Sequence, residues 1–152
     1  MMLELIPGSN AYATLDEAEG YMAALAYCEA WKNATEEQKI AAIVQAARWM
    51  GTLCWAGRKA TKGQALAWPR EGALDADGYE VDPASIPHLV KDANAEFAFR
   101  LLTKDRAGDA KKGVRVAGIT TPDQERELVP QSVRDLLGCL LLSNNSIRLE
   151  RG

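Results

Sequence analysis

A central helix is encoded by residues 35–53, which read TEEQKIAAIVQAARWMGTL. The run opens on Thr35, with Gln38 three residues later. This pair forms a capping box, in which each side chain satisfies a free backbone donor at a helix start. Behind the box, apolar residues recur at helical spacing, and several of the residues between them are alanine. A helix that is apolar nearly all round belongs in a core, so we expect this segment to be the centre of the fold.

Similar signals place the other elements around that helix. A second capping box, Thr14 with Glu17, predicts a helix from about residue 15 to 27. Proline in the first turn predicts helices over residues 87–103 and 130–141. Turn signals without periodicity predict one long ordered loop over residues 57–85. Alternation near residues 113–120 predicts a short strand or half of a hairpin.

These elements predict a mainly α protein, a small bundle of about four helices with a long ordered loop. At 152 residues the chain fits one domain, which we place over residues 1–142. The polar residues 143–152 are expected to form a flexible tail.

One block, residues 48–70, holds three of the four tryptophans and five of the eighteen basic residues, and it contains no acid. Aromatic rings interleaved with cations are typical of proteins that bind a single nucleic-acid strand, because bases stack on the rings and phosphates meet the charges. Tryptophan and arginine are also frequent at the centres of protein interfaces. We expect Trp49 and Trp55 to seal the core and Trp31 to cap the packing of the first two helices. Trp68 either folds back to pin its loop or projects as an anchor.

The composition narrows the class of protein. The net charge is −3, so binding of a polyanion would need a local basic patch. The three cysteines are widely spaced and odd in number, which fits reduced thiols, and we expect them to fill the core. No apolar run approaches a membrane span and no signal peptide opens the chain, so a soluble protein is expected.

Catalytic and metal sites find little support. The only histidine, His88, has no cluster of further ligands and is expected at the surface. The acids between Asp75 and Asp82 resemble a calcium loop, but the glycine stands fourth rather than sixth, which predicts a solvated turn. No glycine-rich phosphate motif occurs. We expect no enzymatic activity, no metal and no cofactor.

Several motifs follow one another in a fixed order. They are YATLDEA at 12–18, AARW at 46–49, WAGRK at 55–59, QALAWPR at 64–70, DG at 77–78, IP at 86–87, VKDA at 90–93 and EFA at 96–98. In this order the chain resembles a family of small tailed-phage proteins often labelled DnaT-like single-stranded-DNA-binding, whose members look like head-tail connector (adaptor, or head-completion) proteins. The likeness spans residues 12–102 and fades beyond.

The resemblance implies a virion structural protein that forms a ring, commonly of twelve copies, under the portal. Its partners would be the portal protein, other copies of itself and a downstream neck or tail protein, with genomic DNA in at most non-specific contact and no membrane. It would be made in the host bacterial cytoplasm and reside at the neck of the virion.

Interface residues are expected in the long loop and the tail, namely Trp68, Pro69, Arg70, Arg58, Lys59, Ile147, Arg148 and Leu149. The alternative function is a single-stranded-DNA-binding module in phage replication. In that case Trp68→Ala should weaken binding by about 1–3 kcal/mol for a stacked base.

Overall fold

The computed structural model describes residues 3–111 and 129–142, without the side chains of residues 104–111. The helices in this part are α1 (Leu15–Ala23), α2 (Glu29–Lys32), α3 (Glu36–Met50), α4 (His88–Lys111) and α6 (Gln131–Leu137), followed by a 3-10 turn over Gly138–Leu140. Two short strands, β1 (Arg58–Lys59) and β2 (Arg70–Glu71), pair antiparallel. The prediction of a mainly α domain is confirmed.

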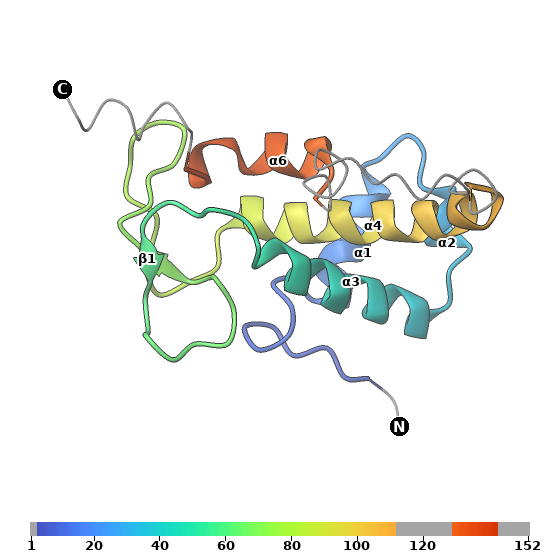
Figure 1. Ribbon diagram of the computed structural model, residues 1–152, viewed down its shortest axis with the longest axis horizontal. Coiled ribbons are helices and arrows are strands. Elements are labelled where there is room, and N and C mark those ends of the chain that lie inside the picture. Colours follow the sequence, from blue (N-terminus) through green and yellow to red (C-terminus); the bar gives the residue numbers. More distant parts are fainter. Residues whose placement is uncertain (1–2, 112–128, 143–152) are drawn as a thin grey trace.

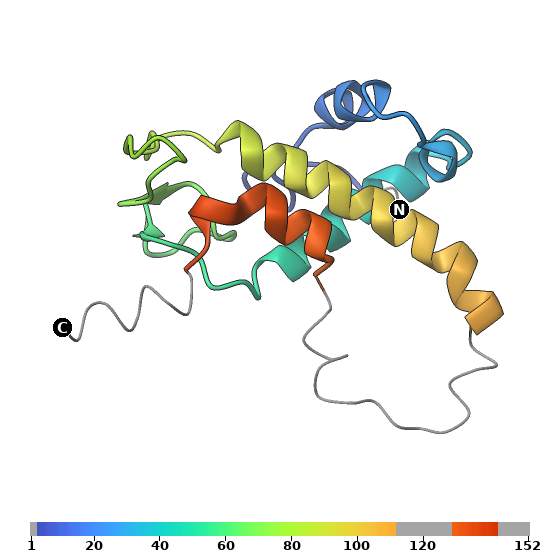
Figure 2. The ribbon, with the colours of Figure 1, turned by 90° about the horizontal axis from the view of Figure 1, so that it is seen from above.

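Helix α4 is the axis of the domain. It crosses the middle of the molecule in Figure 1, with α3 below it and α6 above it. The view from above in Figure 2 shows α1 and α2 on one side of α4 and α6 on the other. All four of these helices contact α4. The helix predicted as the centre, α3, therefore packs against the true centre.

Both predicted capping boxes are present. The Thr35 hydroxyl accepts from the Gln38 backbone N-H, and the Gln38 side chain accepts from the Thr35 backbone N-H. Thr14 and Glu17 make the same pair of bonds at the start of α1. Helix α3 then buries one side against α4 through Ala42, Ile43, Ala46, Ala47 and Met50. Three alanines on that side allow a close approach of the two helices.

A buried asparagine ties three segments of the chain together. Asn94 lies in the first third of α4 and is fully buried. Its side-chain oxygen accepts from the backbone N-H groups of Tyr12 and Ala13, at 3.0 and 3.2 Å. Its amide donates to the carbonyl oxygen of Ile43 in α3, at 3.0 Å. One side chain thus joins α4 both to α3 and to the segment that precedes α1.

Several element boundaries differ from those predicted. Helix α1 ends at Ala23 rather than near residue 27, and the short helix α2 follows it. Helix α4 continues through Gly108 to Lys111, whereas we predicted that it ends near Thr103. One interior glycine costs only about 1 kcal/mol relative to alanine, too little to stop a long helix.

The observed hairpin lies in the segment that was predicted to be one long ordered loop. Arg58 pairs with Glu71 and Lys59 with Arg70. Gly57 has a φ of +73°, and a Cβ at this position would overlap the carbonyl oxygen of Glu71. Strands of two residues are too short to show the alternation by which strands are recognised. The strand predicted near residues 113–120 and the tail predicted over 143–152 lie outside the described residues.

Candidate nucleic-acid interface

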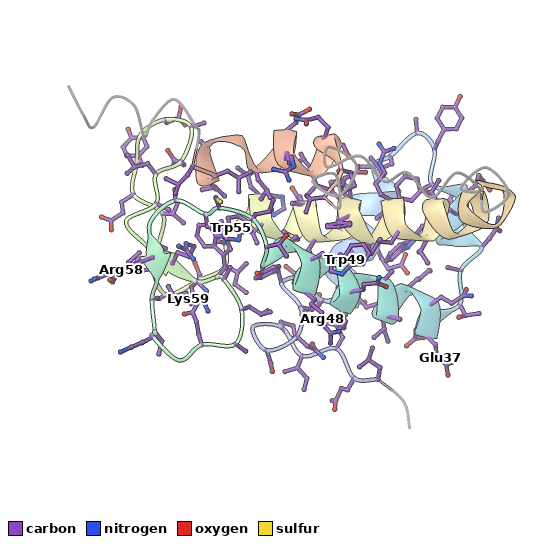
Figure 3. All side chains as sticks on the ribbon, viewed as in Figure 1. Glu37, Arg48, Trp49, Trp55, Arg58 and Lys59 are labelled. Atoms are coloured by element: carbon purple, nitrogen blue, oxygen red, sulfur yellow. The ribbon has the colours of Figure 1, made fainter. Side chains whose placement is uncertain are left out.

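The tryptophans of the basic block are part of the core. Trp68 has no exposed surface and packs edge-on against Trp55, with ring centroids 5.5 Å apart and planes at 88°. The indole N-H of Trp55 donates to the Met50 carbonyl at 3.0 Å. Trp49 is half-buried against Phe97, at 5.9 Å between centroids. The prediction that Trp49 and Trp55 close the core is confirmed (Figure 3).

Of the two arrangements left open for Trp68, the inward one is observed. A ring with no exposed surface offers no face on which a base could stack, so base stacking on Trp68 does not fit this fold. Trp31 is also buried, and its N-H donates to Glu19 at 3.0 Å. Lys39 joins the same carboxylate at 2.9 Å. The two contacts lower the pKa of Glu19.

Arg70 and Pro69 form hydrogen bonds with the backbone of their own loop. The Arg70 guanidinium donates to the carbonyl oxygens of Ala56, Ala67 and Gly57, at 2.8, 3.2 and 2.9 Å. Pro69, which follows a cis peptide bond, accepts through its carbonyl from Ala60 at 3.1 Å. These bonds hold the ends of the loop together and engage three of the five N-H donors of Arg70.

The two basic residues of β1 lie at the surface. Arg58 forms an ion pair with Glu71 on β2, whereas Lys59 has no acidic partner among the described residues. Figure 3 shows Arg58 projecting away from the helices at the end of the molecule. Both are exposed, and their role as contacts stays a prediction.

Lys59 and Arg48 border a surface pocket of about 360 Å³. Arg48 comes from the last turn of α3 and is likewise without an ion pair among the described residues. The remaining lining comes from the C-terminal half of α3, the N-terminal turn and the loop between the strands, and is formed by Ser9, Asn10, Val44, Ala47, Gly51, Ala65, Leu66 and Ala67. No acidic residue lines the pocket. It therefore combines two cations with polar and apolar walls.

Hydrogen bonds inside the N-terminal turn hold this wall of the pocket in place. The Asn10 side chain accepts from the backbone of Ile6 and donates to the carbonyl of Glu4, both at 2.8 Å. Gly8 closes the turn through a bond to the Ala11 carbonyl at 2.7 Å. The buried residues Ala11 and Tyr12 then lead to the bonds with Asn94 described above. The turn is thus connected to the core.

Loop and core also meet at Tyr12. Its hydroxyl accepts from the backbone N-H of Ala67 at 3.3 Å. Burial raises the pKa of Tyr12 to about 12, an effect that this bond and the nearby Arg70 charge only partly oppose. Ala67 lines the pocket and precedes Trp68. The pocket is therefore built on buried contacts on two sides.

Sequence reasoning named Lys59 but missed the other half of the site. Arg48 belongs to the basic block of residues 48–70 but is not among the predicted interface residues, and neither are Ser9 and Asn10. A signal did exist, because Glu36, Ile40, Val44 and Arg48 stand four residues apart and so follow one another along a helix surface. The predicted tail contacts Ile147, Arg148 and Leu149 lie outside the described residues.

Other predicted features can be located. His88 is exposed and lies 3.0 Å from Asp92. Asp75 accepts from the backbone N-H groups of residues 77 and 79 and forms the predicted acidic turn. Cys28 is buried, but Cys54 and Cys139 are exposed, so our prediction of core cysteines was wrong for two of three. Among the residues whose side chains the structure describes, 3–103 and 129–142, no group of three His, Cys, Asp or Glu could hold a metal ion.

The helices of the described segments include none that is long and apolar enough to cross a membrane. Comparison with curated proteins and with solved structures finds no match. A family model described as "Putative DnaT-like ssDNA binding protein" matches residues 4–152.

The match corrects the prediction of a head-tail connector. It also contradicts the prediction that the portal protein, other copies in a ring and a neck or tail component are the partners, because the matched family is described by DNA binding. The motif order had pointed to the right family, but no residue chemistry in it encoded an assembly role. Since the match covers nearly the whole chain, this protein belongs to the DnaT-like single-stranded-DNA-binding family.

Proposed function

We propose that this protein binds single-stranded DNA and that the pocket between Arg48 and Lys59 holds one nucleotide of the strand. The observation that carries the proposal is the pairing of two exposed cations, both without acidic partners among the described residues, across a pocket without acids. In a chain with a net charge of −3, attraction for a polyanion has to be local. The family description supports the same function.

The two cations have different chemistry toward a phosphate. Arg48 offers a planar guanidinium that can bind two phosphate oxygens at once, whereas the Lys59 ammonium acts as a mobile point charge. Both contacts release counterions from the DNA, so binding weakens as salt rises. Such contacts carry no sequence information, and we expect binding without strong sequence preference.

The apolar wall favours a strand whose bases are unpaired. Leu66, Ala65 and Val44 present aliphatic surface beside the two cations. In a duplex the bases are stacked inside and only the backbone would reach the pocket. A single strand can also lay a sugar or a base against the aliphatic wall. This contact takes the place of the stacking on Trp68 that the single-stranded-DNA-binding alternative predicts from the sequence.

The test measures binding of a fluorescently labelled oligodeoxythymidine by anisotropy at several salt concentrations. For single strands the slope of log K against log salt is about −0.7 per phosphate contact, so Arg48→Ala/Lys59→Ala should reduce its magnitude by about 1.4. Lys32→Ala is the matched control, because Lys32 is an exposed lysine on α2 that does not line the pocket.

An unchanged slope in the double variant would place the DNA elsewhere on the protein. Loss of the same slope in Lys32→Ala would show that only overall charge matters. A duplex of the same length should bind more weakly than the single strand, and equal binding would contradict the role of the aliphatic wall.

We also propose that the role is binding rather than catalysis, as the sequence led us to expect. The predicted location in a virion stays a prediction.

A further inference from the structure

A second pocket, of about 500 Å³, lies at the other end of α3. The N-terminal segment, the start of α1 and the first turns of α3 form its walls. Its apolar lining is Leu3, Leu5, Leu15 and Ile40. Leu3 is 50% exposed, and Ile6, further along the same segment, is 48% exposed. This opening leaves large aliphatic side chains in contact with solvent.

The charges around this pocket are negative. Glu4 and Glu36 belong to its lining, no basic residue does, and neither carboxylate has an ion-pair partner among residues whose side chains the structure describes. Glu37, also exposed, projects from the same end of α3 in Figure 3. A cationic ligand would therefore be attracted here and a nucleic acid repelled.

Helix α3 thus separates two pockets of opposite character. Glu36 and Ile40 line the acidic pocket, whereas Val44 and Arg48 line the basic one. Twelve residues of helix place Glu36 and Arg48 about 18 Å apart along the axis. Since one pocket lacks acids and the other lacks bases, one ligand class cannot suit both.

We propose that the acidic pocket is a docking site for an amphipathic basic helix of a partner protein. Such a helix lays aliphatic residues spaced three and four apart into an apolar groove. Lysine or arginine beside them would meet Glu4 and Glu36, which gives the contact its charge complementarity. This site is independent of the DNA site, so the protein can hold a strand and a partner at once.

The probe is a synthetic helical peptide of leucine and lysine, added to the isotopically labelled full chain and followed by amide chemical shifts. Shift changes should be confined to residues 3–5, 15 and 36–40. Binding to Glu4→Gln/Glu36→Gln should weaken at least fivefold, while the matched control Glu80→Gln, an exposed acid outside the pocket, binds as the wild type does.

Two further peptides serve as controls. One keeps the spacing of the leucines, and the other keeps the composition. A leucine-glutamate peptide in the same register should not bind, and a leucine-lysine peptide whose leucines do not share a face should bind at least fivefold more weakly. Equal binding of either peptide, or shift changes centred outside the pocket, would overturn the proposal.

A second copy of the chain is the competing occupant. If light scattering shows a concentration-dependent dimer that Leu3→Ser abolishes, the pocket is a self-association surface and the proposal is wrong. Circular dichroism on each variant identifies loss of fold, and the neutral glutamine variants keep the helix start intact. Oligodeoxythymidine binding should be unchanged in Glu4→Gln/Glu36→Gln, which separates this test from that of the DNA site.

Discussion

A substitution at Asn94 should lower the free energy of unfolding by more than the small change in side-chain size suggests. It is fully buried on α4 and bonds to the backbones of Tyr12, Ala13 and Ile43. Asn94→Ala removes one acceptor shared by two N-H groups and one donor. Tyr12 and Ala13 are themselves fully buried, so their N-H groups cannot turn to water instead.

The size of the expected loss of stability follows from the buried polar groups that Asn94→Ala leaves without a partner. A buried donor without a partner costs about 1–3 kcal/mol, so two of them cost roughly 2–6 kcal/mol. A water that enters the vacated space would lower this value, and we therefore expect about 3–4 kcal/mol. Small domains have a free energy of unfolding of about 5–15 kcal/mol, so the variant should fold but with a much lower stability.

Asn94→Asp separates the acceptor from the donor. Its carboxyl still accepts from Tyr12 and Ala13, but an ionised carboxylate would face the Ile43 carbonyl and lie buried. Burial raises the pKa of such an aspartate in the folded state above its unfolded value of about 3.9. A raised folded pKa gives stability that is present below about pH 3.9 and lost as pH rises through the folded value. The deficit relative to wild type should therefore shrink in acid.

The assay is urea unfolding followed by circular dichroism. The free energies of unfolding are compared with the same dependence on urea concentration for every variant. Asn33→Ala, at an exposed asparagine, is the control and should change the free energy of unfolding by less than about 0.5 kcal/mol. A loss below about 1 kcal/mol for Asn94→Ala would refute the argument that this side chain holds the three segments. A deficit for Asn94→Asp that grows in acid would refute the sign of the pKa shift.

Four further substitutions test the loop and its contact with the core. Gly57→Ala should lower the free energy of unfolding by about 2–4 kcal/mol, because its Cβ overlaps the Glu71 carbonyl at a positive φ, and thermal unfolding measures this. In the wild type the free energy of unfolding should fall between about pH 10 and 12, because the pKa of Tyr12 is raised to about 12 and the fold is stabilised by the neutral phenol until it ionises. Tyr12→Phe should make this fall smaller. Trp68→Ala should cost about 3–5 kcal/mol in urea unfolding, whereas Trp68→Phe should cost less, because its indole N-H finds no acceptor in the described structure. Oligodeoxythymidine affinity should be unchanged in Trp68→Phe, and a loss above tenfold would restore the stacking hypothesis.

Helix starts were the most predictable part of this fold. Thr14 and Thr35 each bond to a residue three positions along the chain, so the signal is local and needs no tertiary context. Most of the apolar residues spaced behind Thr35 are buried for the same reason, because the helical period alone assigns them to one side. What the helices pack against is a property of the whole chain, which explains why α3 rather than α4 was taken as the centre.

The loop was less predictable because its structure depends on distant partners. Arg70 is basic in the sequence, yet its donors are used by carbonyls up to fourteen residues away. Asn94 reads as an ordinary polar residue of a helix, and nothing nearby identifies Tyr12 or Ile43 as its partners. Half of the candidate site was missed for a similar reason, since Arg48 and Lys59 are eleven residues apart in the sequence and border one pocket only in the folded chain.

The interleaving of tryptophans and cations in residues 48–70 does have a physical meaning, although not the stacking it first indicates. Buried rings order the segment, and the ordered segment holds Lys59 and the aliphatic wall of Leu66 beside Arg48. A strand that binds to a pre-formed pocket does not bear the entropy cost of ordering that loop. The acidic end of α3 then limits the path of the DNA, because Glu36 repels phosphates at one end of the helix. We therefore expect the strand to leave the pocket toward the hairpin loop, where Lys62 is exposed.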